Sequence, residues 1–371
     1  MGVSMFHNLM TWLSGMESHL GLLIILLFFS YIAYHYCFRY VYPAVGSGSI
    51  VMAIGVFLLY CMPRYDFWQV IVMMMSVELF IIWFFLTIGF MNSYLYGYLS
   101  FDFLYDRLNI GTWVAGTSVI VLILDEVEHT LHGFIVFLGI VAIILWVAYL
   151  NIILQWLSLN IKKRFSVPIN GTILLATVST QSIVLMLDAL FHNTIPGWIY
   201  QLLIILGLLL YIIGFCSIVR YLFVNRKHHF FAVWANSNCI HYGALAITGF
   251  TMITLQAFPE WVITFVWWWS AVFFFIVELF EVIRLINRVK AKGIVKGIWV
   301  YDTSQWARNF TFGMFYAFTF LYYSQQHATN ELVSMIANYG QYIVGLLLII
   351  ELILTVTSVI ASNFELEEHR S

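Results

Sequence analysis

An arginine and several acids lie within apolar stretches of this sequence, where charge is costly and therefore informative. Arg308 falls near the start of the apolar segment 303–324. A charge in such a segment usually faces a water-filled cavity or an ionic partner. Glu278, Glu281 and Arg284 lie in the preceding apolar segment at i, i+3 spacing, which places them on one helical face. We expect Arg308 to pair with these acids; the alternative is that it attracts anions at the mouth of a pathway.

His241 is the second ionisable residue within an apolar segment, 236–257. A neutral histidine held by hydrogen bonds in a packed core is the ordinary case. Alternatively, its ring faces a pathway, takes up a proton below about pH 6.5 and makes anion passage sensitive to pH.

The sequence lacks the residue patterns of enzymes, haem proteins, metal sites and nucleic-acid-binding proteins. No nucleophile and base stand at a spacing that indicates an enzyme, and no paired axial ligands indicate a haem, so we expect neither activity nor cofactor. The stretch 125–132 contains His129 and His132, but it lacks the HExxH pattern of zinc proteases, and we expect no metal site. Basic residues are dispersed between apolar segments, which does not favour nucleic-acid binding.

The composition identifies the elements that carry these side chains. Of 371 residues, 63% are hydrophobic and only 9% are charged. Soluble domains have about 45–50% apolar and about 25% charged residues. Continuous apolar runs of 18 or more residues are typical of membrane-spanning helices. The sequence therefore predicts an all-α polytopic membrane protein and excludes a water-soluble or disordered chain.

Eleven apolar windows predict eleven spanning helices, and all five prolines fall between them. The windows are 20–42, 48–62, 67–92, 110–125, 132–157, 169–190, 197–224, 236–257, 260–287, 303–324 and 332–361.

Basic residues gather in alternate loops, which sets the expected orientation. They lie after the fifth, seventh and ninth helices, at Lys162 to Arg164, at Arg226 and Lys227, and from Arg288 to Lys296. The opposite loops hold only Arg64. By the positive-inside rule, the basic loops face the cytoplasm. We therefore expect a plasma-membrane protein in contact with lipids, with its N-terminus outside and its C-terminus cytoplasmic.

A two-helix unit recurs five times. Every second helix from 48–62 onward contains small and hydroxyl residues around a glycine: Gly48, Gly111, Gly171, Gly243 and Gly313. The helices between them are longer and bulkier. Small residues either let helices pack closely or line a space. If they line a pore, the expected lining residues are Ser49, Thr112, Thr117, Asn170, Thr177, Thr180, Gln181, His241 and Thr248.

Several of these stretches resemble the tellurite-resistance/dicarboxylate transporter family, which includes the yeast malate permease and plant slow-type anion channels. INGTILLATVSTQS (169–182) resembles its NG-W-hydrophobic-VATQS signature, and YDTSQWARNFTFGMF (301–315) resembles its YDP-YWGMVFPLGMY motif. The likeness covers about 44–362. Thr311 and Ser270 replace two family prolines, as in a diverged member.

The resemblance implies a ten-helix core of five helical hairpins with pseudo-fivefold symmetry around a central pore, assembled as a homotrimer. It implies a phenylalanine gate four residues after the tryptophan of the YW motif, which is Phe310 here. The expected division is an N-terminal segment with one extra helix (1–43), the transport domain (44–362) and a cytoplasmic tail (363–371).

Three functions remain open at this point. The first is an anion channel for chloride- or nitrate-like ions or small organic anions such as malate. The second is a proton-coupled carrier of dicarboxylates or other organic anions, which needs a titratable group in its pathway. The third is a scaffold that reuses the fold without transport.

Overall fold

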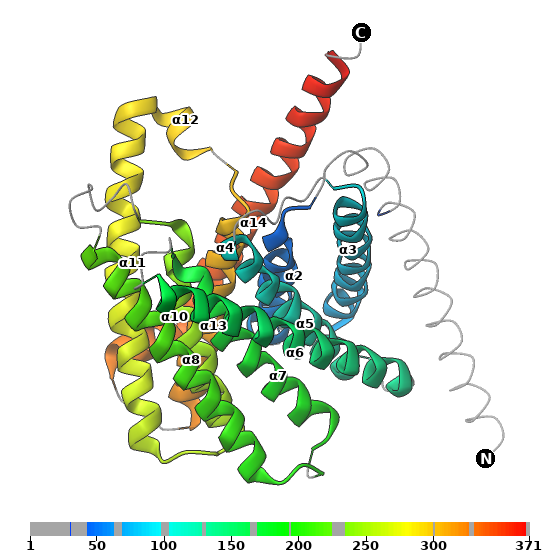
Figure 1. Cartoon of the computed structure of the whole chain (residues 1–371), viewed down its shortest axis with the longest axis vertical. Helices are drawn as coiled ribbons and strands as arrows, with labels where there is room; N and C mark the ends of the chain where they lie inside the picture. Colours follow the sequence, from blue (N-terminus) through cyan, green and yellow to red (C-terminus); the bar gives the residue numbers. More distant parts are fainter. Residues whose placement is uncertain are drawn as a thin grey trace, which may run out of the picture.

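The computed structural model describes residues 30, 43–62, 69–97, 104–127, 131–163, 169–192, 194–224, 234–299, 301–325 and 330–368. Within these ranges every regular element is helical (Figure 1). Seven helices of this part of the chain are long and apolar enough to cross a membrane. This is the composition expected of a membrane-embedded helical protein.

Five helices form the inner part of the molecule. They are α2 (Gly48–Val56, continued by the π-helical turn η3, Phe57–Cys61), α5 (Gly111–Val127), α7 (Leu175–Leu190), α10 (Ile240–Thr254) and α13 (Ser304–Gln325). Four of them follow a 3-10 turn: η2 (Val45–Ser47), η5 (Leu108–Ile110), η6 (Gly171–Leu174) and η7 (Asn236–Cys239). The repeat seen in the sequence is therefore a repeat of local structure.

Five longer helices lie outside them. They are α3 (Gln69–Leu95), α6 (His132–Lys162), α8 (Gly197–Val224), α11 (Glu260–Lys292) and α14 (Glu331–Glu368). Two short helices, α4 (Leu104–Arg107) and α12 (Ile294–Ile298), lie in connections. Pro259 precedes α11, and Gly293 ends it with a φ of 80°, a conformation that glycine adopts at little cost.

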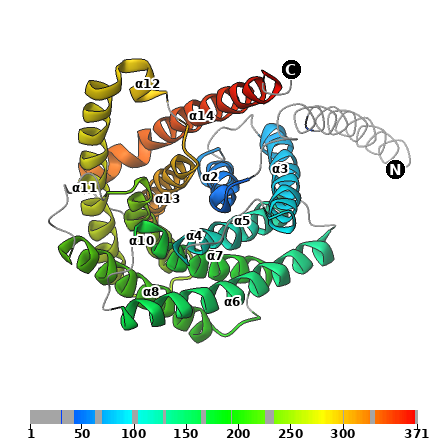
Figure 2. The same cartoon turned by 45° about the horizontal axis from the view of Figure 1, so that its top comes forward.

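The inner helices contact one another in a closed order. α2 contacts α5, α5 contacts α7, α7 contacts α10, α10 contacts α13, and α13 returns to α2. Each outer helix packs on the inner helix that precedes it in the chain. The first four also contact the next inner helix, and α14 contacts the turn η3 that continues α2. We call each inner helix and the outer helix that follows it a helix pair, numbered first to fifth. Figure 2 shows the inner helices surrounded by α3, α6, α8, α11 and α14.

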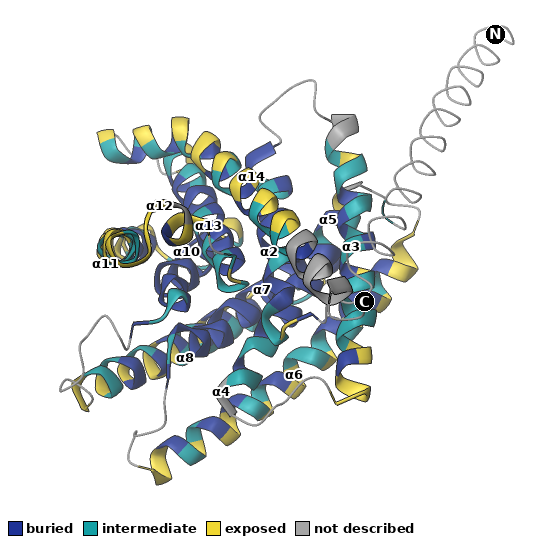
Figure 3. Ribbon diagram, turned by 90° about the horizontal axis from the view of Figure 1, so that it is seen from above, coloured by how far each residue is buried: buried dark blue, intermediate teal, exposed yellow. Residues whose placement is uncertain are grey.

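Burial separates the two sets of helices. In the apolar windows of inner helices α5 and α7, 72% and 83% of the residues are buried, against 17% to 33% in the outer helices. In Figure 3 the outer helices are exposed mainly on the side away from the inner ones. A soluble protein would not expose so many large apolar side chains, whereas lipid would cover them.

The predicted spans from 48–62 to 332–361 all coincide with helices. α14 continues to Glu368, beyond the boundary expected at 362. The predicted extra helix 20–42 lies outside the described residues, apart from Ser30.

Candidate functional site

The five repeated glycines lie at the contacts between neighbouring inner helices. A methyl group added to any of them would come within 3.0 Å of an atom of the next inner helix or its leading turn. The partners of Gly48, Gly111, Gly171, Gly243 and Gly313 are Thr112, Leu175, Ser237, Thr311 and Val56, respectively. The last contact returns to the first helix pair. These glycines therefore let the ring close tightly.

Contacts of α13 define the face on which Phe310 lies. Arg308 contacts α11, Thr311 contacts α10, and Gly313 contacts α2. Successive residues of an α-helix are about 100° apart, so Phe310 is about 200° from Arg308 and between the faces of Thr311 and Gly313. This face is turned to the inside of the ring. Phe310 is 2% exposed there.

Three predicted pore-lining side chains of α5 and α7 instead bond to outer helices. The indole Nε1 of Trp83 donates to Thr117 Oγ1 at 3.3 Å, and that of Trp146 donates to Thr180 Oγ1 at 3.1 Å. Thr177 Oγ1 donates to the Gly207 carbonyl at 3.0 Å. These hydroxyls lie between inner and outer helices and do not face the inside of the ring.

The amide of Gln181 makes the same kind of contact. Its Nε2 donates to the Ile204 carbonyl of α8 at 3.2 Å, and a Cβ on Gly207 would meet this amide. Gly207 therefore makes room for the Gln181 side chain. The amide joins the two helices of the third pair.

The other predicted lining residues bond mainly within their own segments, although Ser49 Oγ also lies 3.5 Å from the Thr303 carbonyl, just before α13. Thr112 and Thr248 donate to carbonyls of their own segments, Asn109 and Ala244, at 2.7 Å. Ser49 Oγ donates to the Gly46 carbonyl at 2.7 Å. Asn170 Oδ1 accepts from the backbone N–H of Thr172 at 3.0 Å and so caps the turn η6. Such bonds satisfy hydroxyl donors inside a packed helix without a second helix.

His241 packs among aromatic rings of the outer helices. Its ring stacks on Phe273 of α11, with centroids 5.3 Å apart, and meets the edge of Phe215 of α8 at 5.7 Å. It is 5% exposed. The imidazole is therefore packed on the outward face of α10, as the core alternative predicts, but the hydrogen bonding expected for it is not found: its Nδ1 is buried without a partner among the described residues.

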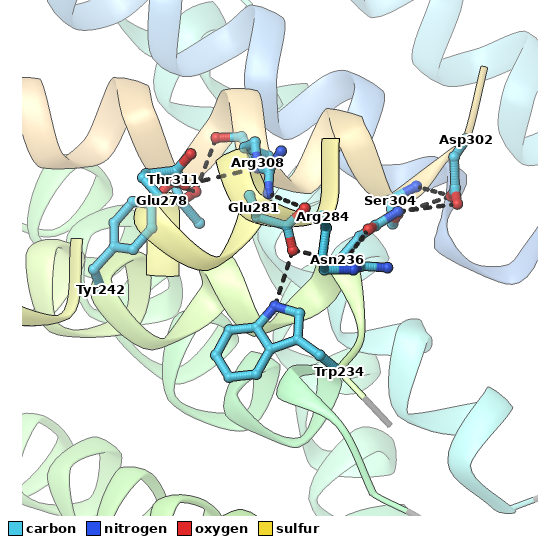
Figure 4. Close-up of polar contacts among 10 residues, drawn as sticks. All are labelled: Trp234, Asn236, Tyr242, Glu278, Glu281, Arg284, Asp302, Ser304, Arg308 and Thr311. Carbon is cyan, nitrogen blue, oxygen red and sulfur yellow. Dashed lines mark hydrogen bonds and ion pairs between the residues drawn. The ribbon is translucent and has the colours of Figure 1, made fainter. Parts of the chain in front are cut away.

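Arg308 forms the ion pairs that the sequence predicts. Its Nη2 lies 2.9 Å from Glu281 Oε2, and its Nε lies 3.7 Å from Glu278 Oε1. All three side chains are at most 21% exposed. Figure 4 shows the guanidinium pointing to both acids. The charge of Arg308 is thus neutralised within the protein.

Further donors complete this network, which we call the Arg308 cluster: Arg308, Glu278, Glu281, Arg284, Trp234, Tyr242, Asn236 and Thr311. Arg284 Nη1 and Trp234 Nε1 donate to Glu281 Oε1 at 2.7 and 2.9 Å, and Tyr242 donates to Glu278 at 3.0 Å. The two carboxylates thus accept hydrogen bonds from Arg284, Trp234 and Tyr242 in addition to their ion pairs with Arg308, and such pairing is what makes buried charges tolerable. The cluster joins α10, α11 and α13 near the start of the two inner helices.

Tyr60 and Phe250 are interior aromatic residues that the sequence patterns do not single out. Their ring centroids are 4.7 Å apart, although α2 and α10 are separated in the ring by α13. Phe250 is nine residues after His241, hence on the opposite face of α10. The position of this pair becomes clear once it is known which inner helices are neighbours in the ring.

The described residues contain no group of three histidine, cysteine or acidic side chains that could bind a metal ion. Part of the stretch 125–132, including Glu128 and His129, lies outside them. In comparisons with known proteins, no protein-family model matches the chain and no curated protein is significantly similar to it.

Proposed function

We propose that this chain is an anion channel or facilitator whose pathway runs inside the ring of inner helices and is closed by Phe310. One observation carries the proposal: Phe310 is buried on the interior face of α13, within five inner helices that contact one another in a closed order. A buried apolar side chain at such a point gates by excluding water and ions. We also propose that the five helix pairs are related by pseudo-fivefold symmetry around this pathway.

The expected substrates are small anions, either chloride- or nitrate-like ions or small organic anions such as malate. Arg308 is neutralised by two carboxylates, so it is not our source of positive potential. The contacts among η2, η5, η6 and η7 gather the starts of four inner helices at one end of the ring. The positive ends of the helix dipoles meet there and favour anions.

A proton-coupled carrier is the alternative, and His241 is its sequence-based candidate. Such a carrier needs a titratable group in the pathway. The packing of His241 against Phe273 and Phe215 on the outward side of α10 favours the channel over this alternative.

We further propose a homotrimer in the plasma membrane, with the starts of the inner helices on the cytoplasmic side. The distribution of basic residues supports the orientation, and the resemblance to the transporter family supports the trimer.

The test is the conductance of the purified protein in planar bilayers under a chloride gradient. We expect little current for the unmodified chain and a larger current for Phe310→Ala, with a reversal potential near that of chloride. Phe318→Ala is the matched control, because Phe318 lies on the same helix but packs against Gly249 of α10. Silence of folded Phe310→Ala would refute the channel, and an equal current from Phe318→Ala would refute the role of Phe310.

A further inference from the structure

The contact between Tyr60 and Phe250 joins helices that are not neighbours in the ring. α13 stands between α2 and α10 and contacts both. On its outward side, α13 packs against α11 and α14. Two aromatic rings from α2 and α10 can therefore meet most directly on the interior side of α13, which is also the side of Phe310.

The surroundings of each ring agree with this placement. Phe250 lies opposite His241, which contacts outer helices α8 and α11. In the π-helical turn η3, Phe57 lies against Gly345 of α14, and Cys61 clusters with Tyr316 and Val344. Phe57 and Cys61 thus point toward α14 and α13, whereas the Tyr60 ring points toward Phe250 of α10.

The π-helical turn itself has a consequence for Tyr60. A π turn changes the angular position of the residues that follow it and occurs frequently at functional sites. Tyr60 is the fourth residue of this turn. The turn therefore sets the direction of the Tyr60 ring toward Phe250.

The pair lies at a different depth from Phe310. Gly243 of α10 faces Thr311, whereas Gly249 faces Phe318. Phe310 is thus level with the first of these contacts and Phe250 with the second. The two contacts are six residues apart on α10 and seven on α13, which corresponds to about 10 Å along the helices.

We propose that Tyr60 and Phe250 form a second constriction, in series with Phe310 and nearer the other end of the ring. This inference rests on the proposed function, because a constriction has meaning only in a pathway. Two apolar barriers in series must both open before an ion passes. Removing one of two barriers lowers the total resistance only in part, so the current rises but the remaining barrier then limits it.

The first experiment measures chloride currents of Phe310→Ala, Phe250→Ala and the double variant. We expect the double variant to exceed the unmodified chain by more than the product of the two single fold-changes. Phe310→Ala combined with Phe318→Ala is the control, because Phe318 lies at the depth of Phe250 but faces Gly249. A double variant that conducts no better than Phe310→Ala alone would overturn the second constriction, as would an equal gain from the control.

The second experiment needs no current. Met314 follows Phe310 by four residues, so it shares the interior face at a depth between the two constrictions, and it is 1% exposed. Met314→Cys is placed in a chain whose four native cysteines are replaced by serine. We expect Phe250→Ala to speed its modification by a membrane-impermeant thiol reagent added on the Tyr60 side, and Phe318→Ala not to.

The two experiments separate the proposals. Faster modification without current in any variant supports the constriction and counts against anion conduction. Current in Phe310→Ala with no change of modification in Phe250→Ala supports the channel and overturns the second constriction.

Discussion

The boundary between the second and third helix pairs differs from that between the fourth and fifth. At the former, Trp146 of α6 donates to Thr180 of α7, and Gly139 fits against Leu190. At the latter, Trp267 of α11 likewise donates to Thr319 of α13, at 3.1 Å. Of these two boundaries, the fourth–fifth one also contains the Arg308 cluster, whose ion pairs join the same two helices, α11 and α13.

The indole–threonine bond and the Arg308 cluster have different structural roles. A tryptophan of one outer helix donating to a threonine of the next inner helix recurs at three boundaries, with Trp83 and Thr117 as the third pair. It is a general means of docking one helix pair on the next. The ionic cluster instead anchors the outward face of the one helix that carries Phe310 on its inward face.

Replacing Arg308 should remove the anchor that distinguishes the fourth–fifth boundary, and we expect it to lower stability more than any other change considered below. Arg308→Gln leaves Glu278 and Glu281 facing each other with only Arg284 nearby, and an uncompensated buried charge costs about 3–5 kcal/mol. We expect that loss in the free energy of unfolding of the detergent-solubilised protein. Arg284→Gln is the control; its smaller loss follows because Arg308 still pairs with Glu281.

A second substitution tests whether the unpaired negative charge causes the loss of stability. Glu278→Gln in the Arg308→Gln chain removes the excess negative charge, so it should recover part of the stability. If Arg308→Gln costs no more than Arg284→Gln, the cluster does not anchor α13.

The sequence predicts the helices better than the directions of their side chains. Apolar length and proline placement locate the five inner and five outer helices, because burial in lipid demands continuous apolar runs, but they do not locate the short connecting helices α4 and α12. The pairing of Arg308 is also predictable, since a buried cation needs an acid and Glu281 stands on the adjacent helix. Thr117 and Thr180 show the limit: a hydroxyl on a small-faced helix can face a pore or a tryptophan, and only the packing of α3 and α6 decides.

Close packing of the inner ring at the fourth–fifth boundary gives the second prediction. An added methyl at Gly243 would collide with the Thr311 side chain of α13. We expect Gly243→Ala to cost about 1–3 kcal/mol of unfolding free energy, the usual cost of overpacking. Gly197→Ala, where an added methyl meets nothing within 4 Å, is the matched control.

Thr311→Ser tests the contact directly, since it removes the Cγ2 atom that the new methyl would meet. Combined with Gly243→Ala it should restore part of the stability. A Gly243→Ala chain as stable as Gly197→Ala would mean that the ring is looser than these contacts require.

The smallest effect concerns the indole–threonine bonds, and it decides whether the two boundaries share one docking device. Hydrogen bonds between membrane helices contribute about 0.6 kcal/mol on average and at most about 1.7. A double-mutant cycle of Trp146→Phe and Thr180→Val should give a coupling in that range, and so should Trp267→Phe with Thr319→Val. Equal couplings, measured by unfolding in the same detergent, are expected because both bonds are neutral and of similar length. Glu278 is eleven residues, or about 16 Å, from Trp267 along α11. A clearly larger coupling at Trp267 would therefore mean that the Arg308 cluster strengthens this bond over that distance, so that the fourth–fifth boundary is a cooperative unit rather than a common docking contact with charges added.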